Sequence, residues 1–539
     1  MASEVVPESI VSATIVERRE PAGELPVRGR EILAVLLAVV LCDLTLYRGA
    51  GLAGVAVLFL VAPGLLVLGS PAPRLGGRFW LASAMLVLLA GRMIWLGSAL
   101  AVAAGFALVV AVATVLVGWR PGVPDVIWYA LQTTVAGGLG LARYARAIVR
   151  RGPAIPSSVW FNVGLPVAAL ALFGTLFVLA NPDLATWVAD TARTVWRNLS
   201  EWFGSLEASW LEVAFWGLVA WLTAGLLRPL RHLGGSPPTE PAAGLLLYPP
   251  AVPQEAAAPY TAIRNTLAAV SALFAVYLVF EFKTLWFRVF PQGFYYSGYA
   301  HEGAAWLTIA LAVSTVVLSV AFRGGVLQDP RLPRLKRWAW LWSAENFVLA
   351  IAVYHRLYIY IGFNGMTRMR MVGLFGMSAV VVGFILVVWK IASRRDFAWL
   401  FHRHLWTVAV AAYLYALTPV DALVHTYNVR RVLAGDPAPS VQIGWHPISA
   451  EGLLVLHPLV RCEDQAIREG IRALLAERAA ELELTAERRA QLGWTATQLA
   501  DRVLLERLRR VSEDWDEYRD PAASAAAWQS FRKYAYHWY

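Results

Sequence analysis

Long apolar segments recur along most of this chain, and they limit its possible folds more than any other feature. A helix needs about 20 apolar residues to cross the hydrocarbon core of a bilayer. Segments of this kind fall at residues 31–48, 52–70, 79–96, 99–118, 126–142, 158–180, 208–227, 263–290, 304–322, 337–361, 372–391 and 404–420. They predict an all-α fold, a polytopic transmembrane helical bundle of eleven or twelve spans.

The charged residues support a membrane protein and argue against other classes. They make up only 16% of the chain, compared with about a quarter in soluble domains. The net charge of +10 comes from short basic clusters between apolar segments rather than from one basic face, which argues against a nucleic-acid partner. Cys42 and Cys462 are too few for a disulfide framework or a metal cage. The lipid bilayer is the expected partner, and no metal or cofactor is predicted.

Lys and Arg beside the apolar segments predict the orientation, because the cytoplasmic side retains positive charge during insertion. The basic loops assigned to the cytoplasm are residues 143–151, 228–231, 323–337 and 390–395. They place the chain after Asp421 on the outer side. A cytoplasmic N-terminus requires an even number of spans before residue 143, where five segments lie. The weakest is 126–142, with Gln132 and two adjacent glycines, and it either spans the membrane or is re-entrant or interfacial.

The chain is expected to divide into five regions. They are an N-terminal cytoplasmic tail (1–30), a first transmembrane half (31–227) with an outer interfacial helix near 184–203, a Pro-rich linker (228–262), a second transmembrane half (263–420) and an extramembrane helical tail (421–539). In the tail, Thr495 and Gln498 have the spacing of a capping box before an amphipathic helix. Such helices need a partner surface.

Polar side chains at membrane depth usually face a bundle interior or a cavity, so they are the candidate functional residues. The densest group is Glu345, Arg356, Tyr360, Asn364, Thr367, Arg368 and Arg370, and a second group is Tyr299, His301 and Glu302. Glu345 and Arg356 are eleven residues apart, about 16 Å along a helix, so each is expected to pair with a neighbouring helix. Arg368 and Arg370 are expected at the outer end, held by acids, lipid phosphates or an anionic ligand. The alternative is an ion-paired helix hairpin without a ligand.

Three segments resemble a known family. They are YSGYAHEG (296–303), HRLYIYIGFNGMTRMRMVGLFGM (355–377) and TPVDALVHTYNVRR (418–431). These segments are similar to those of bacterial membrane proteins called domain of unknown function 4173, which is related to 4153. The likeness covers about residues 260–435, implies a polytopic protein of the bacterial inner membrane, and adds Asn428 to the candidates. His301 and Glu302 stand where that family usually has an arginine pair, so no role of those arginines carries over.

Three functions remain open, because the sequence contains no H-E-x-x-H motif, Walker loop, dinucleotide fingerprint or nucleophile elbow, and no catalytic residue is predicted. The first is a non-enzymatic scaffold or sensor-like envelope component whose outer tail (421–539) engages a protein partner. The second is a transporter or lipid-handling protein for an anionic solute or lipid, suggested by the arginine cluster. The third is a membrane-embedded transferase, which requires His301 or Glu302 to converge with Arg368.

Overall fold

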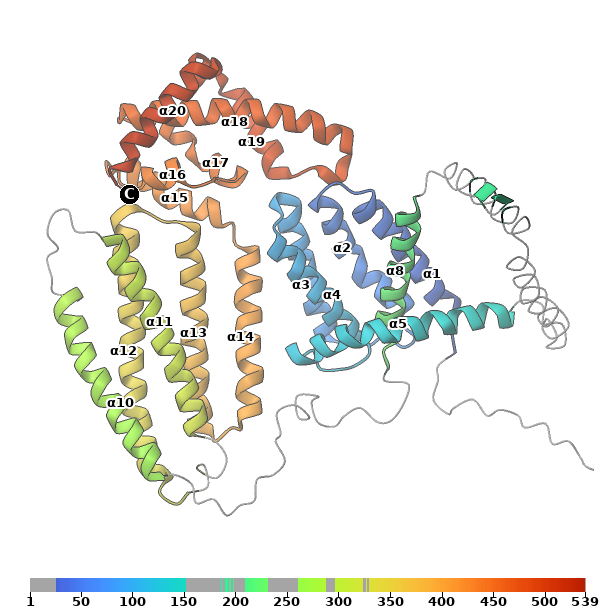
Figure 1. Ribbon diagram of the computed structural model, residues 1–539, viewed down its shortest axis with the longest axis horizontal. Coiled ribbons are helices and arrows are strands. Elements are labelled where there is room, and N and C mark those ends of the chain that lie inside the picture. The colour runs from blue at the N-terminus through green and yellow to red at the C-terminus, as the bar shows by residue number, and fades with distance from the viewer. Residues whose placement is uncertain are drawn as a thin grey trace, which may run out of the picture.

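The computed structural model describes residues 26–151, 209–230, 260–286 and 296–538, except for 323–325 and 327–328, together with a few positions between 186 and 197. For residues 296–302 it describes the helix but not the side chains. The predicted segment 158–180, most of the interfacial helix near 184–203 and most of the linker 228–262 lie outside the described residues. In the described part every regular element is a helix (Figure 1).

Eight described helices are long and apolar enough to cross a membrane. They are α2 (Leu52–Gly69), α3 (Gly77–Leu96), α4 (Ala99–Leu116), α8 (Trp210–Leu227), α10 (Tyr260–Glu281), α11 (Tyr296–Ala321), α12 (Leu332–Asn364) and α13 (Arg368–Ser393). A ninth span results if α14 (Phe397–Leu417) and α15 (Val420–Leu433), which meet at a bend of 65°, count as one. The prediction of an all-α polytopic bundle is therefore confirmed. The described residues contain fewer spans than the eleven or twelve predicted.

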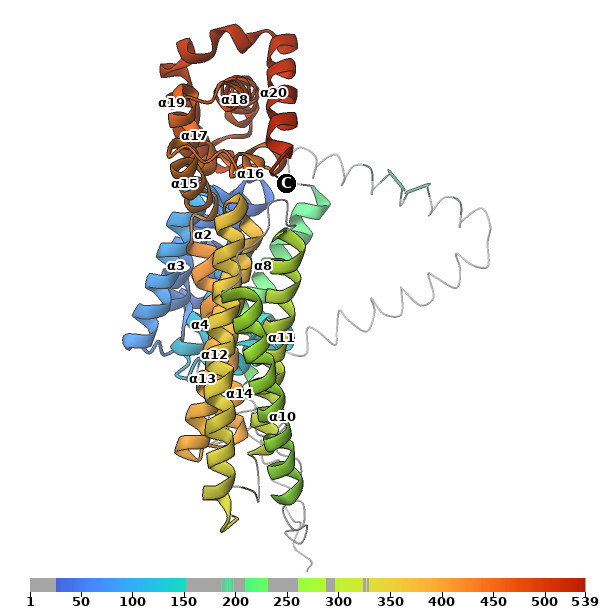
Figure 2. The same ribbon diagram turned by 90° about the vertical axis from the view of Figure 1, so that its left-hand side faces the viewer.

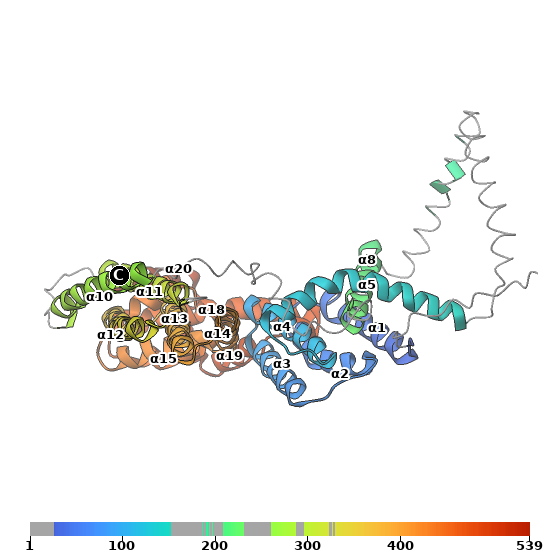
Figure 3. The same cartoon turned by 90° about the horizontal axis from the view of Figure 1, so that it is seen from below.

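Two predicted segments in the described part are not candidate spans. Residues 31–48 form α1 (Gly29–Cys42), a helix of 14 residues followed by one π-helical stretch. Glu31 lies near the start of α1 and Asp43 directly follows its end, so the apolar stretch between them is too short to cross a membrane. Residues 126–142 lie in α5 (Val123–Arg151), which runs across the neighbouring helices rather than parallel to them (Figures 1 and 3). The re-entrant or interfacial alternative for this segment agrees with that direction.

The membrane helices form two groups that lie side by side (Figure 3). The first group contains α1 to α5 and α8, and the second contains α10 to α14. One contact between them is a hydrogen bond of 2.9 Å from the Tyr413 hydroxyl on α14 to the Met85 carbonyl on α3. Each group has its own apolar core, with Phe59 and Leu86 fully buried in the first and Trp342 and Phe384 in the second.

The C-terminal helices form a separate layer across one end of both groups (Figures 1 and 2). After α15 they are α16 (Ser440–Trp445), α17 (Ala450–Leu456), α18 (Gln465–Leu492), α19 (Leu499–Arg510) and α20 (Pro521–Tyr536). We call the region from α15 to α20 the C-terminal unit. It has a core of its own, in which Ile467, Ile471, Leu504 and Phe531 are buried. Its amphipathic helices thus bury their apolar faces against one another.

Candidate functional site

The sharp turn between α12 and α13 is the starting point of the site. Gly365 ends α12 with φ +95°, a conformation that favours glycine. A Cβ at this position would lie 2.6 Å from Asn428 Oδ1 and 2.9 Å from Pro439 Cβ, so the close approach also requires glycine. Thr367 then starts α13, and its hydroxyl accepts a hydrogen bond of 3.2 Å from the Arg370 amide. A turn at Gly365 is therefore followed at once by the start of the next helix.

The C-terminal unit holds this turn through side chains on α15 and α16. Asn428 is fully buried; its side chain accepts from the Met366 amide at 2.7 Å and donates to the Met366 carbonyl at 2.9 Å. Gln442 donates to the Asn364 carbonyl at 2.9 Å. Arg431 donates to the carbonyls of Ile361 and Gly362 in the last turn of α12. The turn is therefore fixed by direct bonds to the layer above it.

The two arginines that open α13 have different partners. Arg368 forms a two-pronged ion pair with Asp421 of α15, and Asp421 also accepts from the Ser449 amide at 2.8 Å. Arg370 is buried and donates to the Gly365 carbonyl and, at 2.5 Å, to Asn364 Oδ1. Its guanidinium carbon lies 3.6 Å from the centre of the Tyr360 ring. In the described part of the chain no carboxylate pairs with Arg370.

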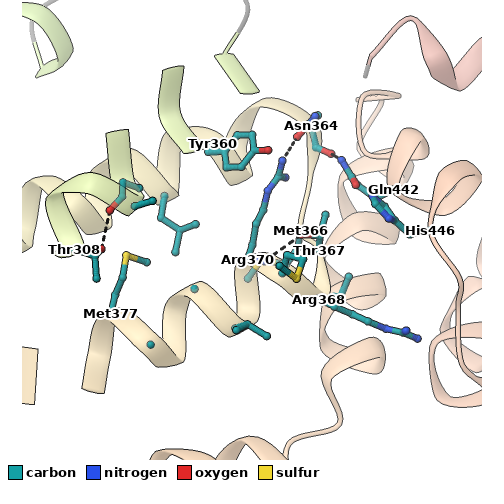
Figure 4. Close-up of a pocket in the computed structure, with 18 of the residues that line it drawn as sticks. Thr308, Tyr360, Asn364, Met366, Thr367, Arg368, Arg370, Met377, Gln442 and His446 are labelled. Carbon is teal, nitrogen blue, oxygen red and sulfur yellow. Dashed lines mark hydrogen bonds between the residues drawn. The ribbon is translucent and has the colours of Figure 1, made fainter. Parts of the chain in front are cut away.

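A cavity of about 790 Å³ adjoins this turn between α11, α12, α13 and the C-terminal unit (Figure 4). Figure 4 shows Arg370 rising from α13 toward Asn364, with Tyr360 on one side and Gln442 and His446 on the other. Apolar and small residues line the membrane end, among them Ala305, Ile309, Leu357, Val372, Gly376 and Met377. The polar end holds Thr367, Arg368, Arg370, His425, Gln442 and His446. No Asp or Glu is among the described lining residues.

The cavity opens on the outer surface of the helix bundle. Three of its apolar lining side chains are also strongly exposed: Ile309 is 50% exposed, Met369 73% and Val372 46%. Apolar side chains on the outside of a membrane bundle face lipid. The cavity therefore has an apolar edge that is exposed on the outside of the bundle.

A profile of the family described as Domain of unknown function (DUF4153) matches residues 32–456. The chain belongs to the DUF4153 family. The sequence resemblance had pointed to the related family 4173, so the membership is corrected while the unknown function is the same. The match extends from α1 to α17 and includes both membrane groups, well beyond residues 260–435. No curated protein and no solved structure matches the chain.

In this DUF4153 protein five predicted site residues come together around the cavity. They are Tyr360, Asn364, Thr367, Arg368 and Arg370. Asn428 lies behind the turn and fixes it. Tyr299, His301 and Glu302 belong to the first turns of α11, but their side chains lie outside the described part.

The other two predicted residues lie away from the cavity lining. Arg356 donates to both oxygens of Glu281 on α10, at 2.6 and 2.5 Å, in a pair that is almost completely buried. A Cβ on Gly303 of α11 would lie 2.1 Å from Arg356 Nη1, so glycine allows α11 to approach this pair. Glu345 is half-buried and precedes Arg356 on α12. As expected, Arg356 pairs with a neighbouring helix.

Besides Thr308 of α11, three polar lining residues escaped the sequence analysis: His425, Gln442 and His446. They come from α15 and the residues around α16, more than 50 positions after the turn that they face. His425 lies inside the family-like segment 418–431, which is the only signal that pointed to it. Burial and the nearby charges of Arg370 and Arg368 lower the pKa of His446, so its imidazole is neutral at pH 7. Arg368 and Arg370 are therefore the charged groups in the lining.

Among the described residues no three His, Cys, Asp or Glu side chains are close enough together to hold a metal ion. The arrangement at the turn is a cationic end on an apolar cavity. Chemically, it can bind an anion that is attached to an apolar body.

Proposed function

We propose that this multi-pass DUF4153 protein binds an anionic membrane lipid in the cavity beside the α12–α13 turn. The observation that carries the proposal is the buried guanidinium of Arg370, which has no carboxylate partner in the described structure and adjoins an apolar cavity among membrane helices. A buried charge is costly unless an opposite charge or several hydrogen bonds compensate it. A lipid phosphate at Arg370 supplies the missing negative charge.

The shape of the cavity supports a lipid rather than a small soluble anion. Its apolar lining on α11 and α13 suits an acyl chain, and its exposed edge at Met369 and Val372 offers entry from the bilayer. Binding pockets usually combine many apolar contacts with a few polar groups that fix orientation. This supports the lipid-handling alternative of the sequence analysis.

A sensor-like role is the second candidate, and a specific contact favours it. The turn that lines the cavity is bonded directly to Asn428 and Gln442 of the C-terminal unit. A ligand that shifts the turn therefore also shifts the C-terminal unit, and the outward face of that unit would engage the envelope partner.

The proposed location is a bacterial inner membrane, with the C-terminal unit on the outer side. The basic loops at the opposite end of the membrane helices favour this orientation. A reporter fused after Tyr539 tests that side.

Filling the cavity tests the lipid proposal directly. A Cβ on Gly376 of α13 meets no atom within 4 Å, so Gly376→Leu places a side chain in the cavity without a backbone clash. Gly91 of α3 has equally open space but lies outside the cavity, so Gly91→Leu is the matched control. Both changes add the same side chain to a membrane helix and raise helix propensity equally.

The readout is the thermal midpoint of the purified full chain in detergent, with phosphatidylglycerol or zwitterionic phosphatidylcholine added. We expect phosphatidylglycerol to stabilise the wild type and Gly91→Leu, by about 2.7 kcal/mol at a hundredfold excess over the dissociation constant. Gly376→Leu should lose that stabilisation. Equal stabilisation of all three proteins, or equal effects of both lipids on the wild type, would refute the proposal.

A further inference from the structure

A second hollow, which we call the α13–α14 groove, runs between these two helices and has a volume of about 610 Å³. The lining residues of α14 recur every three or four positions, so they form one stripe along the helix; they are Arg403, Trp406, Thr407, Val410, Ala411 and Leu414. At a helical rise of 1.5 Å per residue the stripe is about 16 Å long. The groove therefore has the length and direction of an extended chain that lies parallel to the membrane helices.

The groove lies on the face of α13 opposite the cavity beside the α12–α13 turn. Leu374, Ser378 and Val382 line the groove, whereas Gly376 and Val380 line the cavity. Residues two positions apart on a helix point about 200° away from each other, so the two sets lie on opposite sides of α13. The groove is thus a separate site.

The groove is open toward the outside of the bundle, and its wall is apolar. Val382 is 44% exposed, Val410 45% and Leu414 49%. The two hydroxyls in the lining already donate within their own helices, Ser378 to the Leu374 carbonyl at 2.7 Å and Thr407 to the Arg403 carbonyl at 2.9 Å. Apolar side chains on the outside of a membrane bundle face lipid, so an acyl chain suits this wall.

Arg403 is the charged side chain at one end of the groove. It lies on the half of α14 that is farther from the C-terminal unit (Figure 1). Its guanidinium carbon is 5.5 Å from the centre of the Trp399 ring, one turn nearer the helix end, and the Trp399 ring contacts Trp389 at 5.7 Å. Tryptophans gather at the headgroup level of a bilayer, so the guanidinium extends to that level.

No acid from the lining neutralises Arg403. The described residues that line the groove include no Asp or Glu. The carboxylate nearest to Arg403 in the sequence is that of Asp396, and it caps α14 by accepting from the Trp399 amide at 2.7 Å. A cation at headgroup level above an apolar groove is complementary in charge and in polarity to a phospholipid with a net negative charge.

We infer that the α13–α14 groove binds a second anionic phospholipid, with its phosphate at Arg403 and an acyl chain along α13 and α14. The inference does not depend on the proposed lipid site at Arg370. Arg368 and Arg370 lie at the end of α13 next to the C-terminal unit, and Arg403 lies toward the opposite end. α13 then carries one lipid on each face, and the two phosphates lie in opposite leaflets.

Native mass spectrometry of the full-length protein tests this by counting bound phosphatidylglycerol molecules and measuring their dissociation constants, with zwitterionic phosphatidylcholine as the reference lipid. We expect the wild type to bind two phosphatidylglycerol molecules more tightly than phosphatidylcholine. Arg403→Gln should weaken one of the two by about tenfold, the effect of one charge-assisted hydrogen bond, and leave the other unchanged. Arg395→Gln is the matched control, because Arg395 is also exposed after α13 but lies outside the groove lining.

A second pair of variants tests the groove itself while Arg403 stays in place. Ala379→Leu adds a larger side chain to the lining and should weaken the same lipid as Arg403→Gln, whereas Ala107→Leu, at an exposed position of α4 outside the groove, should have no effect. Unchanged binding in Arg403→Gln, or equal losses in Arg395→Gln, would overturn the inference. A wild-type dimer that Ala379→Leu dissociates would also overturn it, since a second copy would then fill the groove.

Gly376→Leu separates this site from the proposed function. If Gly376→Leu loses one lipid and Arg403→Gln loses the other, both sites are supported. If Arg403→Gln loses a lipid and Gly376→Leu binds as the wild type does, the proposed site at Arg370 fails and the α13–α14 groove stands. The reverse result refutes the groove alone.

Discussion

Each of the two membrane groups contains a buried arginine–glutamate ion pair of the same geometry, and in each group the pair joins two helices. In the first group Arg228, after α8, donates through Nε and Nη2 to both oxygens of Glu31 on α1, at 2.7 and 3.1 Å. In the second, Arg356 uses the same two nitrogens toward Glu281, at 2.6 and 2.5 Å. Each pair joins helices that are far apart in the sequence. A charge that must lie among apolar helices is compensated by another helix.

The groups differ in what lies beside the ion pair. In the second group Arg370 is buried next to a cavity and has no carboxylate partner in the described structure. In the first group Arg92 of α3 pairs with Glu451 of α17 at 3.0 Å. A buried arginine alone therefore does not mark a site, because Arg228 and Arg356, which are equally buried in the described structure, are each neutralised by an acid. The combination of a cation without an acid and a cavity distinguishes the second group.

The largest expected effect concerns the two ion pairs. Glu281→Leu leaves the charge of Arg356 buried without the Glu281 carboxylate, and it should lower the free energy of unfolding by about 3–5 kcal/mol. Glu31→Leu should cost a similar amount in the first group, since Arg228 is equally buried. Unfolding of the full chain in mixed micelles, followed by circular dichroism, measures both.

A double variant is the control for the ion pair. Glu281→Leu with Arg356→Leu removes both charges, and the loss should largely disappear because no charge remains uncompensated. If Glu281→Leu alone costs less than about 1 kcal/mol, the pair is not the packing device described here.

The next effect tests the turn that only the second group has. Gly365→Ala should cost about 1–3 kcal/mol, because alanine is strained at φ +95° and its Cβ meets Asn428. Gly373→Ala on α13 is the control; its Cβ meets no atom within 4 Å, and alanine should stabilise that helix by up to about 1 kcal/mol. Thermal unfolding of both variants measures the difference. Equal effects would show that the turn is not constrained.

The next prediction compares one contact of the C-terminal unit with each membrane group. Asn428 makes two hydrogen bonds to Met366 in the second group, whereas Gln498 accepts one bond of 2.8 Å from the Gly97 amide in the first. Asn428→Ala should therefore cost about 1–3 kcal/mol and Gln498→Ala about 1 kcal/mol. Limited proteolysis at the junctions, combined with unfolding, ranks the two. The reverse order would mean that the unit is held mainly by the first group.

The smallest effect is a pH dependence from His446. Burial, followed by the charges of Arg370 and Arg368, lowers its pKa below the ordinary value of 6.5, so the folded state favours the neutral ring. Stability from this group is complete above pH 6.5 and decreases as the pH falls toward the folded-state pKa. His446→Gln should remove that decrease in stability between pH 7.5 and 5.

An anionic lipid should weaken the same pH-dependent decrease in the wild type, because a phosphate stabilises the charged ring. Melting curves across this range measure both effects, and an unchanged slope in His446→Gln would exclude His446 as the source.

The sequence predicted the helical membrane bundle because the length of an apolar segment follows from the thickness of the hydrocarbon core. It also predicted the segment from Tyr360 to Arg370, because polar residues are rare at that depth. It did not predict His425, Gln442 and His446, since their place at the cavity depends on how the C-terminal unit packs. The spacing of residues along the chain does not predict such a long-range contact.

Two local patterns have tertiary explanations that the sequence alone did not provide. The capping box expected at Thr495 and Gln498 is wrong, because these side chains instead accept from the amides of Ala50 and Gly97 in the first group. The glycines of segment 126–142 allow α5 to cross α8 closely. A Cβ on Gly137 would lie 2.1 Å from Trp221 Cδ1.

The most direct test of a lipid at Arg370 is the structure of the full chain in nanodiscs made with phosphatidylglycerol, determined by electron cryomicroscopy. We expect density for a phosphate within hydrogen-bond distance of the Arg370 guanidinium and for an acyl chain between α11 and α13. A cavity that is empty or closed, while ordered lipids are resolved elsewhere on the bundle, would contradict the central claim.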